Sequence, residues 1–220
     1  MVNLTTMFIC EFHKFLVWKI KQIRMKKGVV VLVVVVAILA LFVFWGIGTY
    51  NSLVSKEEAV KSQWANVENV YQRRLDLIPN LVATVKGYAT HEEKTLTEVV
   101  EARAKATQVT IDPTKLNDSN IAAFEKVQSG LSGALSRLMV SVERYPDLKA
   151  NQNFLDLQSQ LEGTENRIAV ERRKYNEIAQ QFNTSIRSFP ANLIAGMGSF
   201  EMKGYFKSTE AASVAPVVKF

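Results

Sequence analysis

The chain has 220 residues, of which 48% are hydrophobic and 22% charged, and its formal net charge at pH 7 is +6. Most of this excess precedes residue 28: residues 1–27 hold six Lys and Arg side chains and one Glu, whereas residues 51–220 hold 21 basic and 20 acidic side chains. Nucleic-acid binding needs a basic folded domain, so the near neutrality of residues 51–220 excludes nucleic acid as a partner. The single cysteine, Cys10, leaves no disulfide within the chain.

Residues 1–24 are the least expected part of the sequence. They precede Met25-Lys26-Lys27, and two lysines followed by an apolar run are typical of the beginning of a membrane-anchored protein. We therefore favour Met25 as the true start, with residues 1–24 arising from a mis-set start. The alternative is a basic amphipathic segment that lies in the anionic inner leaflet.

Residues 28–48 form an uninterrupted run of 21 uncharged residues. As a helix this run reaches about 31 Å, enough to cross the hydrocarbon core of a bilayer, and we predict a transmembrane helix over residues 28–50. A cleaved signal peptide is the alternative, but Gly46-Ile47-Gly48 resembles a cleavage site poorly. Because basic residues concentrate on the cytoplasmic side of a span, residues 1–27 are predicted to be cytoplasmic and residues 51–220 extracytoplasmic.

Residues 51–190 show the spacing of amphipathic helices and no period-two alternation, so an all-α domain is predicted. A helix is expected from about residue 119 to residue 143, with Asn117 and the residues after it capping its start. The clearest helix spans 151–188, where apolar residues recur every seven positions as in coiled-coil packing. The short connection at Tyr145-Pro146 makes these two helices antiparallel neighbours. The seven-residue repeat consists of Phe154, Leu161, Ile168, Tyr175, Phe182 and Phe189.

Pro79 decides how residues 53–106 are divided into helices. Proline removes a backbone hydrogen bond and clashes with the preceding turn, so we predict that the chain reverses at Pro79-Asn80. That reversal gives an antiparallel up-down four-helix bundle with helices of comparable length. In the alternative, the apolar stripe continues in phase across Pro79, and one long helix kinked there belongs to a three-helix bundle. Residues 191–220 are predicted to form an irregular, apolar tail packed on the bundle.

The predicted extracytoplasmic residues offer few groups for catalysis or metal binding. They contain one histidine, His91, and no cysteine, which excludes thiolate metal sites and most nucleophile–base pairs. The position that would complete an H-E-x-x-H zinc motif is Thr95, and the position for a Glu-x-x-His iron motif is Tyr88. We therefore expect no catalytic residue, metal, cofactor or small-molecule substrate, and we interpret His91 as a surface residue.

A few charged side chains fall among the apolar positions of the predicted helices. Arg74 continues an apolar row at seven-residue spacing, Glu171 lies in the seam of residues 151–188, and Arg103 lies at the end of its helix. Buried charges need partners, so we interpret these residues as an ionic layer that fixes helix register. The alternative is a recognition patch or a lined groove. Arg172 and Asn176 complete the candidate set, although residues 171–174 also fit a solvated helix face.

Short stretches in a fixed order give the sequence a distinctive pattern. They are LIPNLV at 77–82, VKGYATHE at 85–92, ERYPDLKA at 143–150, LEGTENRI at 161–168, RRKYN at 172–176 and PVVKF at 216–220. This pattern resembles the LemA family over about residues 25–220, and residues 1–24 depart from it. The resemblance implies a bacterial inner-membrane protein with one N-terminal anchor and a helical-bundle domain, but it supplies no activity and no catalytic residues.

The sequence leaves more than one class of function open. An anchor, seven-residue seams and the lack of a catalytic constellation favour a membrane-tethered, non-catalytic scaffold or protein-interaction module of the cell envelope. Confinement to the bilayer raises local concentration, so homo-oligomers or contacts with other envelope proteins are expected. The alternative is an accessory or regulator of a membrane peptidase, or a cryptic hydrolase in which a serine meets a desolvated lysine. A third class, an envelope-binding module, would not bind through charge alone.

Overall fold

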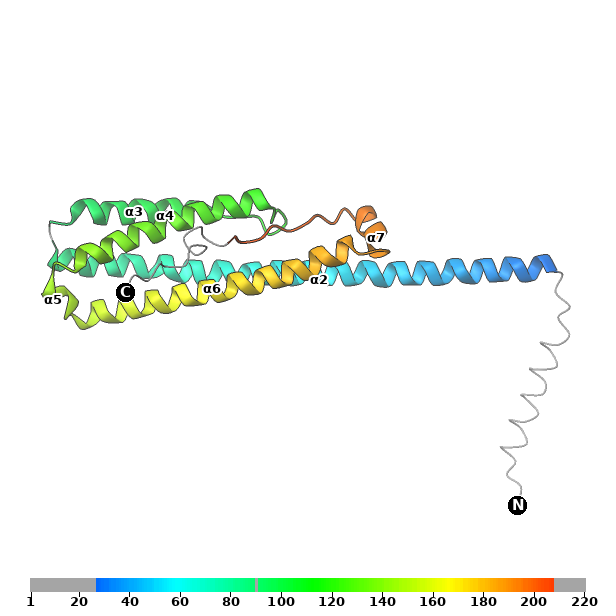
Figure 1. Cartoon of the computed structure of the whole chain (residues 1–220), viewed down its shortest axis with the longest axis horizontal. Helices are drawn as coiled ribbons and strands as arrows, with labels where there is room; N and C mark the ends of the chain where they lie inside the picture. The colour runs from blue at the N-terminus through cyan, green and yellow to red at the C-terminus, as the bar shows by residue number, and fades with distance from the viewer. Residues whose placement is uncertain (1–26, 90, 208–220) are drawn as a thin grey trace, which may run out of the picture. The chain divides into compact units, whose positions relative to one another are not determined.

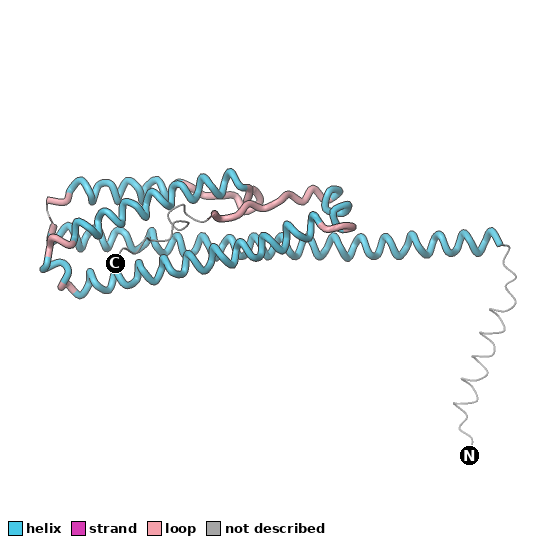
Figure 2. Tube along the Cα trace, in the orientation of Figure 1, coloured by secondary structure: helices cyan, strands magenta, loops and turns pink. Residues whose placement is uncertain are grey.

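The computed structural model describes residues 27–89 and 91–207, and the predictions for residues 1–26 and 208–220 lie outside this part. The described residues contain no strand, which confirms the all-α prediction (Figures 1 and 2). The chain divides into two units, residues 1–48 and 49–220. The helices are α2 (Lys27–Tyr88), α3 (Glu93–Gln108), α4 (Asp118–Val142), α5 (Pro146–Lys149), α6 (Gln152–Arg187) and α7 (Ala191–Met197).

The first unit contains the apolar part of α2. All of its large apolar side chains between Val29 and Phe44 are between 44% and 74% exposed. Within the described residues, α2 is the one helix that is long and apolar enough to cross a membrane. A helix that is apolar on every face needs an apolar environment around it, which a bilayer provides.

The predicted reversal at Pro79-Asn80 is wrong, because α2 continues through Pro79 to its end. The proline leaves the carbonyl of Leu75 without its usual intrahelical amide. Arg103 of α3 supplies the missing donor, its Nε lying 2.9 Å from that oxygen. The apolar stripe also stays buried on both sides of the proline, with Ile78 and Leu81 fully inaccessible. Burial of this stripe and a donor from another helix therefore keep the helix intact.

The chain reverses instead between the end of α2 at Tyr88 and the start of α3 at Glu93, and the carboxylate of Glu92 joins this connection to a second one. Nη2 of Arg144 donates to Oε1 of Glu92 at 2.7 Å, and the hydroxyl of Tyr145 donates to the same oxygen at 3.1 Å. Both donors belong to the connection between α4 and α5, so this carboxylate ties that connection to the turn before α3. His91 lies in the turn and is exposed.

Helices α4 and α6 both begin after an asparagine. Oδ1 of Asn117 accepts from the amide of Asn120 at 2.9 Å, and Oδ1 of Asn151 accepts from the amide of Phe154 at 3.1 Å. These bonds satisfy amides that have no partner within the helix. The predicted cap at Asn117 is confirmed, and the helix predicted for residues 151–188 corresponds to α6.

Four helices of the second unit, α2, α3, α4 and α6, contribute to two apolar core clusters. The first cluster contains α2 from Leu75 onward, α3, the later part of α4 and the beginning of α6. The second contains α2 from Leu53 to Tyr71, the beginning of α4 and the rest of α6, together with Ala195 and Phe206. Residues 201–207, which are neither helix nor strand, follow α7 and run back along the bundle (Figure 2).

Candidate functional site

A polar layer separates the two core clusters and is centred on Arg74 of α2. Arg74 is only 1% exposed. Its Nη1 donates to Oε1 of Glu165 at 2.5 Å and to Oγ of Ser132 at 2.9 Å, and its Nη2 donates to Oε1 of Gln128. Without such partners a buried guanidinium would be strongly destabilising. Because Gln128 and Ser132 belong to α4 and Glu165 to α6, the layer ties three helices together at one level.

The same layer forms the floor of an open groove between α4 and α6. Arg74, Gln128, Glu165 and Arg172 are among the residues that line a hollow of about 920 Å³. A second hollow of about 760 Å³ shares Glu165 with the first and continues toward Met139. The two hollows together are termed the α4–α6 groove.

Residues 203–207, termed the guest segment, end at this groove, which Lys207 lines, and side chains of α4 and α6 hold the segment beside it. Nδ2 of Asn183 donates to the carbonyl of Lys203 at 2.7 Å, and Oδ1 of Asn183 accepts from the Lys203 amide at 2.8 Å. Asn176 binds Phe206 in the same way, with distances of 2.8 and 2.9 Å. Each asparagine of α6 thus makes the pair of backbone hydrogen bonds that a neighbouring β-strand would make.

The spacing of the two asparagines matches that of an extended chain. Asn176 and Asn183 are seven residues apart, which corresponds to about 10.5 Å along a helix. Lys203 and Phe206 are three residues apart, which corresponds to about 10 Å in an extended chain. One asparagine every two helical turns therefore meets every third residue of the guest segment, which runs antiparallel to α6.

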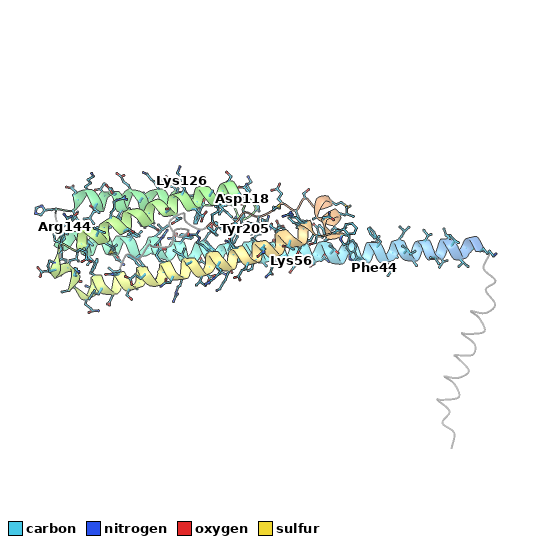
Figure 3. All side chains as sticks on the ribbon, viewed as in Figure 1. Phe44, Lys56, Asp118, Lys126, Arg144 and Tyr205 are labelled. Atoms are coloured by element: carbon cyan, nitrogen blue, oxygen red, sulfur yellow. The ribbon has the colours of Figure 1, made fainter. Side chains whose placement is uncertain are left out.

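The amides between these points bind to the start of α4. Gly204 donates to the carbonyl of Leu116 at 2.8 Å, and the amide of Tyr205 donates to Oδ1 of Asp118 at 3.2 Å. Figure 3 labels Asp118 and Tyr205 where the segment passes the first turn of α4. A Cβ on Gly204 would lie only 2.5 Å from the backbone nitrogen of Asp118. A glycine is therefore needed for this close approach of two backbones.

Arg172 holds the last residue of the guest segment. Its Nη2 donates to the carbonyl of Lys207 at 2.9 Å and to Oε1 of Glu125, and its guanidinium lies 4.8 Å from the centre of the Phe206 ring. The other oxygen of Glu125 accepts from the Lys207 amide at 3.4 Å. As a result, all five consecutive amides from residue 203 to residue 207 donate to the bundle.

Two side chains of the guest segment are also buried. Phe206 is 5% exposed and stacks on Trp64, with ring centroids 5.8 Å apart and an interplanar angle of 12°. Lys203 is 4% exposed, and its Nζ donates to Oε1 of Glu57 at 2.6 Å. An aromatic anchor and a paired ammonium therefore add to the backbone contacts.

Two of the predicted residues lie away from the groove. Arg103 binds the Leu75 carbonyl. Glu171 accepts from Nζ of Lys174 at 2.8 Å and from Nε2 of Gln63 in α2 at 2.6 Å. The Lys174 ammonium and then the Gln63 amide hold the pKa of Glu171 below its ordinary value. Both residues contact helices rather than the guest segment.

A serine–lysine contact is present, but at the surface. Nζ of Lys56 in α2 donates to Oγ of Ser185 in α6 at 2.6 Å. Lys56, labelled in Figure 3, is exposed to solvent. A lysine that activates a serine nucleophile must be desolvated, so this pair lacks the environment that a hydrolase requires.

Of the predicted set, Arg74 and Arg172 line the groove, and Asn176 holds the guest segment beside it. Sequence reasoning missed Asn183 and Glu125, which bind the guest segment from α6 and α4. A signal for Asn183 was available, because it follows Asn176 by seven residues and lies beside the apolar row of α6. Nothing in the local sequence around Glu125 distinguishes it from a solvated helix face.

The fold and the site define a helical-bundle protein with an N-terminal apolar helix and with side chains on α4 and α6 that bind an extended segment of its own backbone. The family model described as LemA family matches residues 63–220, and the chain belongs to this family.

Three relatives illustrate the similarity. Protein LemA of Metamycoplasma hominis is 26% identical over 176 residues, which cover 80% of this chain and 77% of the relative. Magnetosome protein MamQ 2 of Paramagnetospirillum magneticum is 27% identical over 214 residues, covering 89% of this chain and 78% of the relative. Magnetosome protein MamQ of Magnetospirillum gryphiswaldense is 26% identical with the same coverage. None of these names states an enzymatic activity.

Proposed function

We propose that the chain is a membrane-anchored, non-catalytic interaction scaffold of the bacterial cell envelope. The exposed apolar part of α2 supports the anchor, because its side chains need a lipid environment. The basic residues before it support a cytoplasmic N-terminus, with the bundle on the extracytoplasmic face of the inner membrane. The relatives, whose names are not those of enzymes, agree with a role without catalysis.

The observation that carries the proposal is the binding of five consecutive backbone amides by α4, α6 and the turn before α4. Contacts to backbone groups make few demands on side chains, as in the addition of a peptide strand to a sheet edge. Here the demands are a residue without a side chain at position 204 and an aromatic residue at position 206. A bundle built in this way recognises an extended polypeptide.

The proposed occupant is the C-terminal segment of a second copy of the chain. Every copy carries a segment that fits the groove, so an exchange between two copies would recreate the same contacts. The connection between α7 and the guest segment supports such an exchange, because Ser199 has a φ of 54° and is exposed, as a hinge residue would be. Confinement to one membrane raises the local concentration of the second copy.

Photo-cross-linking in native membranes tests this proposal. Ser129 is exposed and lines the groove, so a photoreactive residue there would lie beside the occupant. With two differently tagged copies, we expect adducts that join both tags and that map by mass spectrometry to residues 203–220 of the second copy. The same photoreactive residue at Glu101, exposed on α3, is the control. Adducts confined to single copies would contradict self-association, and adducts with another envelope protein would reject a second copy as the occupant.

A further inference from the structure

A second apolar surface lies on α7 and the residues on either side of it. Phe189, Leu193 and Met197 recur every four residues and are 81%, 54% and 84% exposed, and Met202 is 51% exposed. Phe189 belongs to the apolar row that the sequence pattern predicts to be buried. The α7 residue that the bundle does bury is the small Ala195. Helix α7 therefore exposes Leu193 and Met197, while Ile194 is half-buried and the smaller Ala195 is buried.

This surface has little charge to keep it in water, because Glu201 is the one charged residue between residues 188 and 202. The 13 residues from 188 to 200 contain no Asp, Glu, Lys, Arg or His. The solvent-facing side of a surface helix is normally polar, and contiguous exposed apolar side chains mark interaction surfaces. An apolar partner is therefore needed for Phe189, Leu193, Met197 and Met202.

Phe200, which follows α7, contacts Tyr50, which follows the apolar run of α2. The ring centroids of Phe200 and Tyr50 are 5.5 Å apart. Gly198 permits this contact, because a Cβ there would lie 2.7 Å from Cε2 of Phe200 and 3.0 Å from Cε2 of Tyr50. Tyr50 follows Gly48 by two residues, so their Cα atoms lie within about 8 Å whatever the direction of the bundle.

We infer that residues 189–202, with α7 at their centre, lie in the interfacial layer of the membrane and that lipid covers their apolar side chains. Interfacial helices insert their apolar faces by roughly 5–10 Å, and tyrosines are enriched at this level. The inference rests on the proposed membrane anchor, because Tyr50, which contacts Phe200, follows the apolar run by two residues.

Fluorescence quenching in the full-length protein tests the inference. In a Cys10→Ser background, single cysteines are introduced as Leu193→Cys and Met197→Cys and labelled with an environment-sensitive fluorophore in nanodiscs of phosphatidylethanolamine and phosphatidylglycerol. Val140→Cys on α4, where the native side chain is 72% exposed, is the water-facing control. Val36→Cys, in the apolar part of α2, reports on the anchor. We expect labels at 193 and 197 to be quenched several-fold more by nitroxide lipids, and several-fold less by aqueous iodide, than the label at 140.

Each other outcome overturns the inference in a recognisable way. If the label at 36 is quenched by lipid while those at 193 and 197 respond to iodide as the label at 140 does, the interfacial position is wrong and the anchor stands. If nitroxide lipids do not quench the label at 36 either, both the proposed anchor and the inference are wrong. Protection of 193 and 197 from both quenchers would show that protein, not lipid, covers α7.

Discussion

The side chain of Arg103 offsets the loss of a backbone hydrogen bond that Pro79 causes at Leu75. The Arg103 Nε donates to the carbonyl that Pro79 leaves without an amide partner. We expect Arg103→Ala to lower the free energy of unfolding by about 1–3 kcal/mol, the range for a buried polar group without a partner. In a Pro79→Ala background the new amide can bind Leu75, so the cost of Arg103→Ala should shrink. Urea titrations of the four variants measure this coupling, and additive effects would contradict it.

Protonation of Glu171 is expected to lower the stability of the bundle at acidic pH. Lys174 and Gln63 hold its pKa below the ordinary value of 4.5 in the folded state. Its contribution to stability is therefore complete above pH 4.5 and is lost as the pH falls through the lower folded-state pKa. We expect Glu171→Gln to lower the free energy of unfolding at neutral pH. On acidification to about pH 3, the free energy of unfolding should fall less in this variant than in the wild type. Urea titrations at both pH values test this, with Glu177→Gln, exposed on the same helix, as the control. Equal acid sensitivity of wild type and Glu171→Gln would contradict the assignment.

At the scale of elements, the guest segment depends on side chains of α6. Asn183→Ala would leave the amide and carbonyl of Lys203 without partners, at roughly 1–3 kcal/mol for each group that stays buried. We expect faster hydrogen–deuterium exchange across residues 203–207 in this variant, while α4 and α6 stay protected. Asn153→Ala, at an exposed position of the same helix, should leave exchange unchanged. Unchanged exchange in Asn183→Ala would show that the asparagines do not hold the segment.

The elements also show which parts of the structure the sequence can predict. Helix α6 and the cap at Asn117 follow from local spacing and local hydrogen bonding, so both were predictable. The continuation of α2 through Pro79 was not predictable, because the donor that replaces the missing amide comes from Arg103 in the next helix. The guest segment has no periodic pattern of its own, since its partners are side-chain and backbone groups scattered between residues 57 and 183. Arg74 was recognised as a charge in an apolar row, but its three partners were not.

At the scale of the whole molecule, the proposed anchor predicts a topology. In the proposed topology, which follows from the basic residues before the apolar run, residues 1–27 are cytoplasmic and the bundle is outside. Protease added to intact spheroplasts should therefore digest the region beyond Tyr50. The control is a cytoplasmic protein that stays intact until the spheroplasts are lysed. Survival of the bundle until lysis would place it on the cytoplasmic side and contradict the proposed location.

The most direct test of the central claim is co-purification of two differently tagged copies from native membranes, with and without a fitting guest segment. In Gly204→Ala the added Cβ would lie 2.5 Å from the backbone of α4, whereas Cβ atoms on Gly163 meet nothing within 4 Å. Gly163→Ala is therefore the matched control, and it should raise helix stability by about 0.5–1 kcal/mol. We predict that wild-type and Gly163→Ala copies co-purify and that Gly204→Ala copies separate while keeping their helical circular dichroism. Undiminished co-purification of Gly204→Ala would contradict assembly through the guest segment.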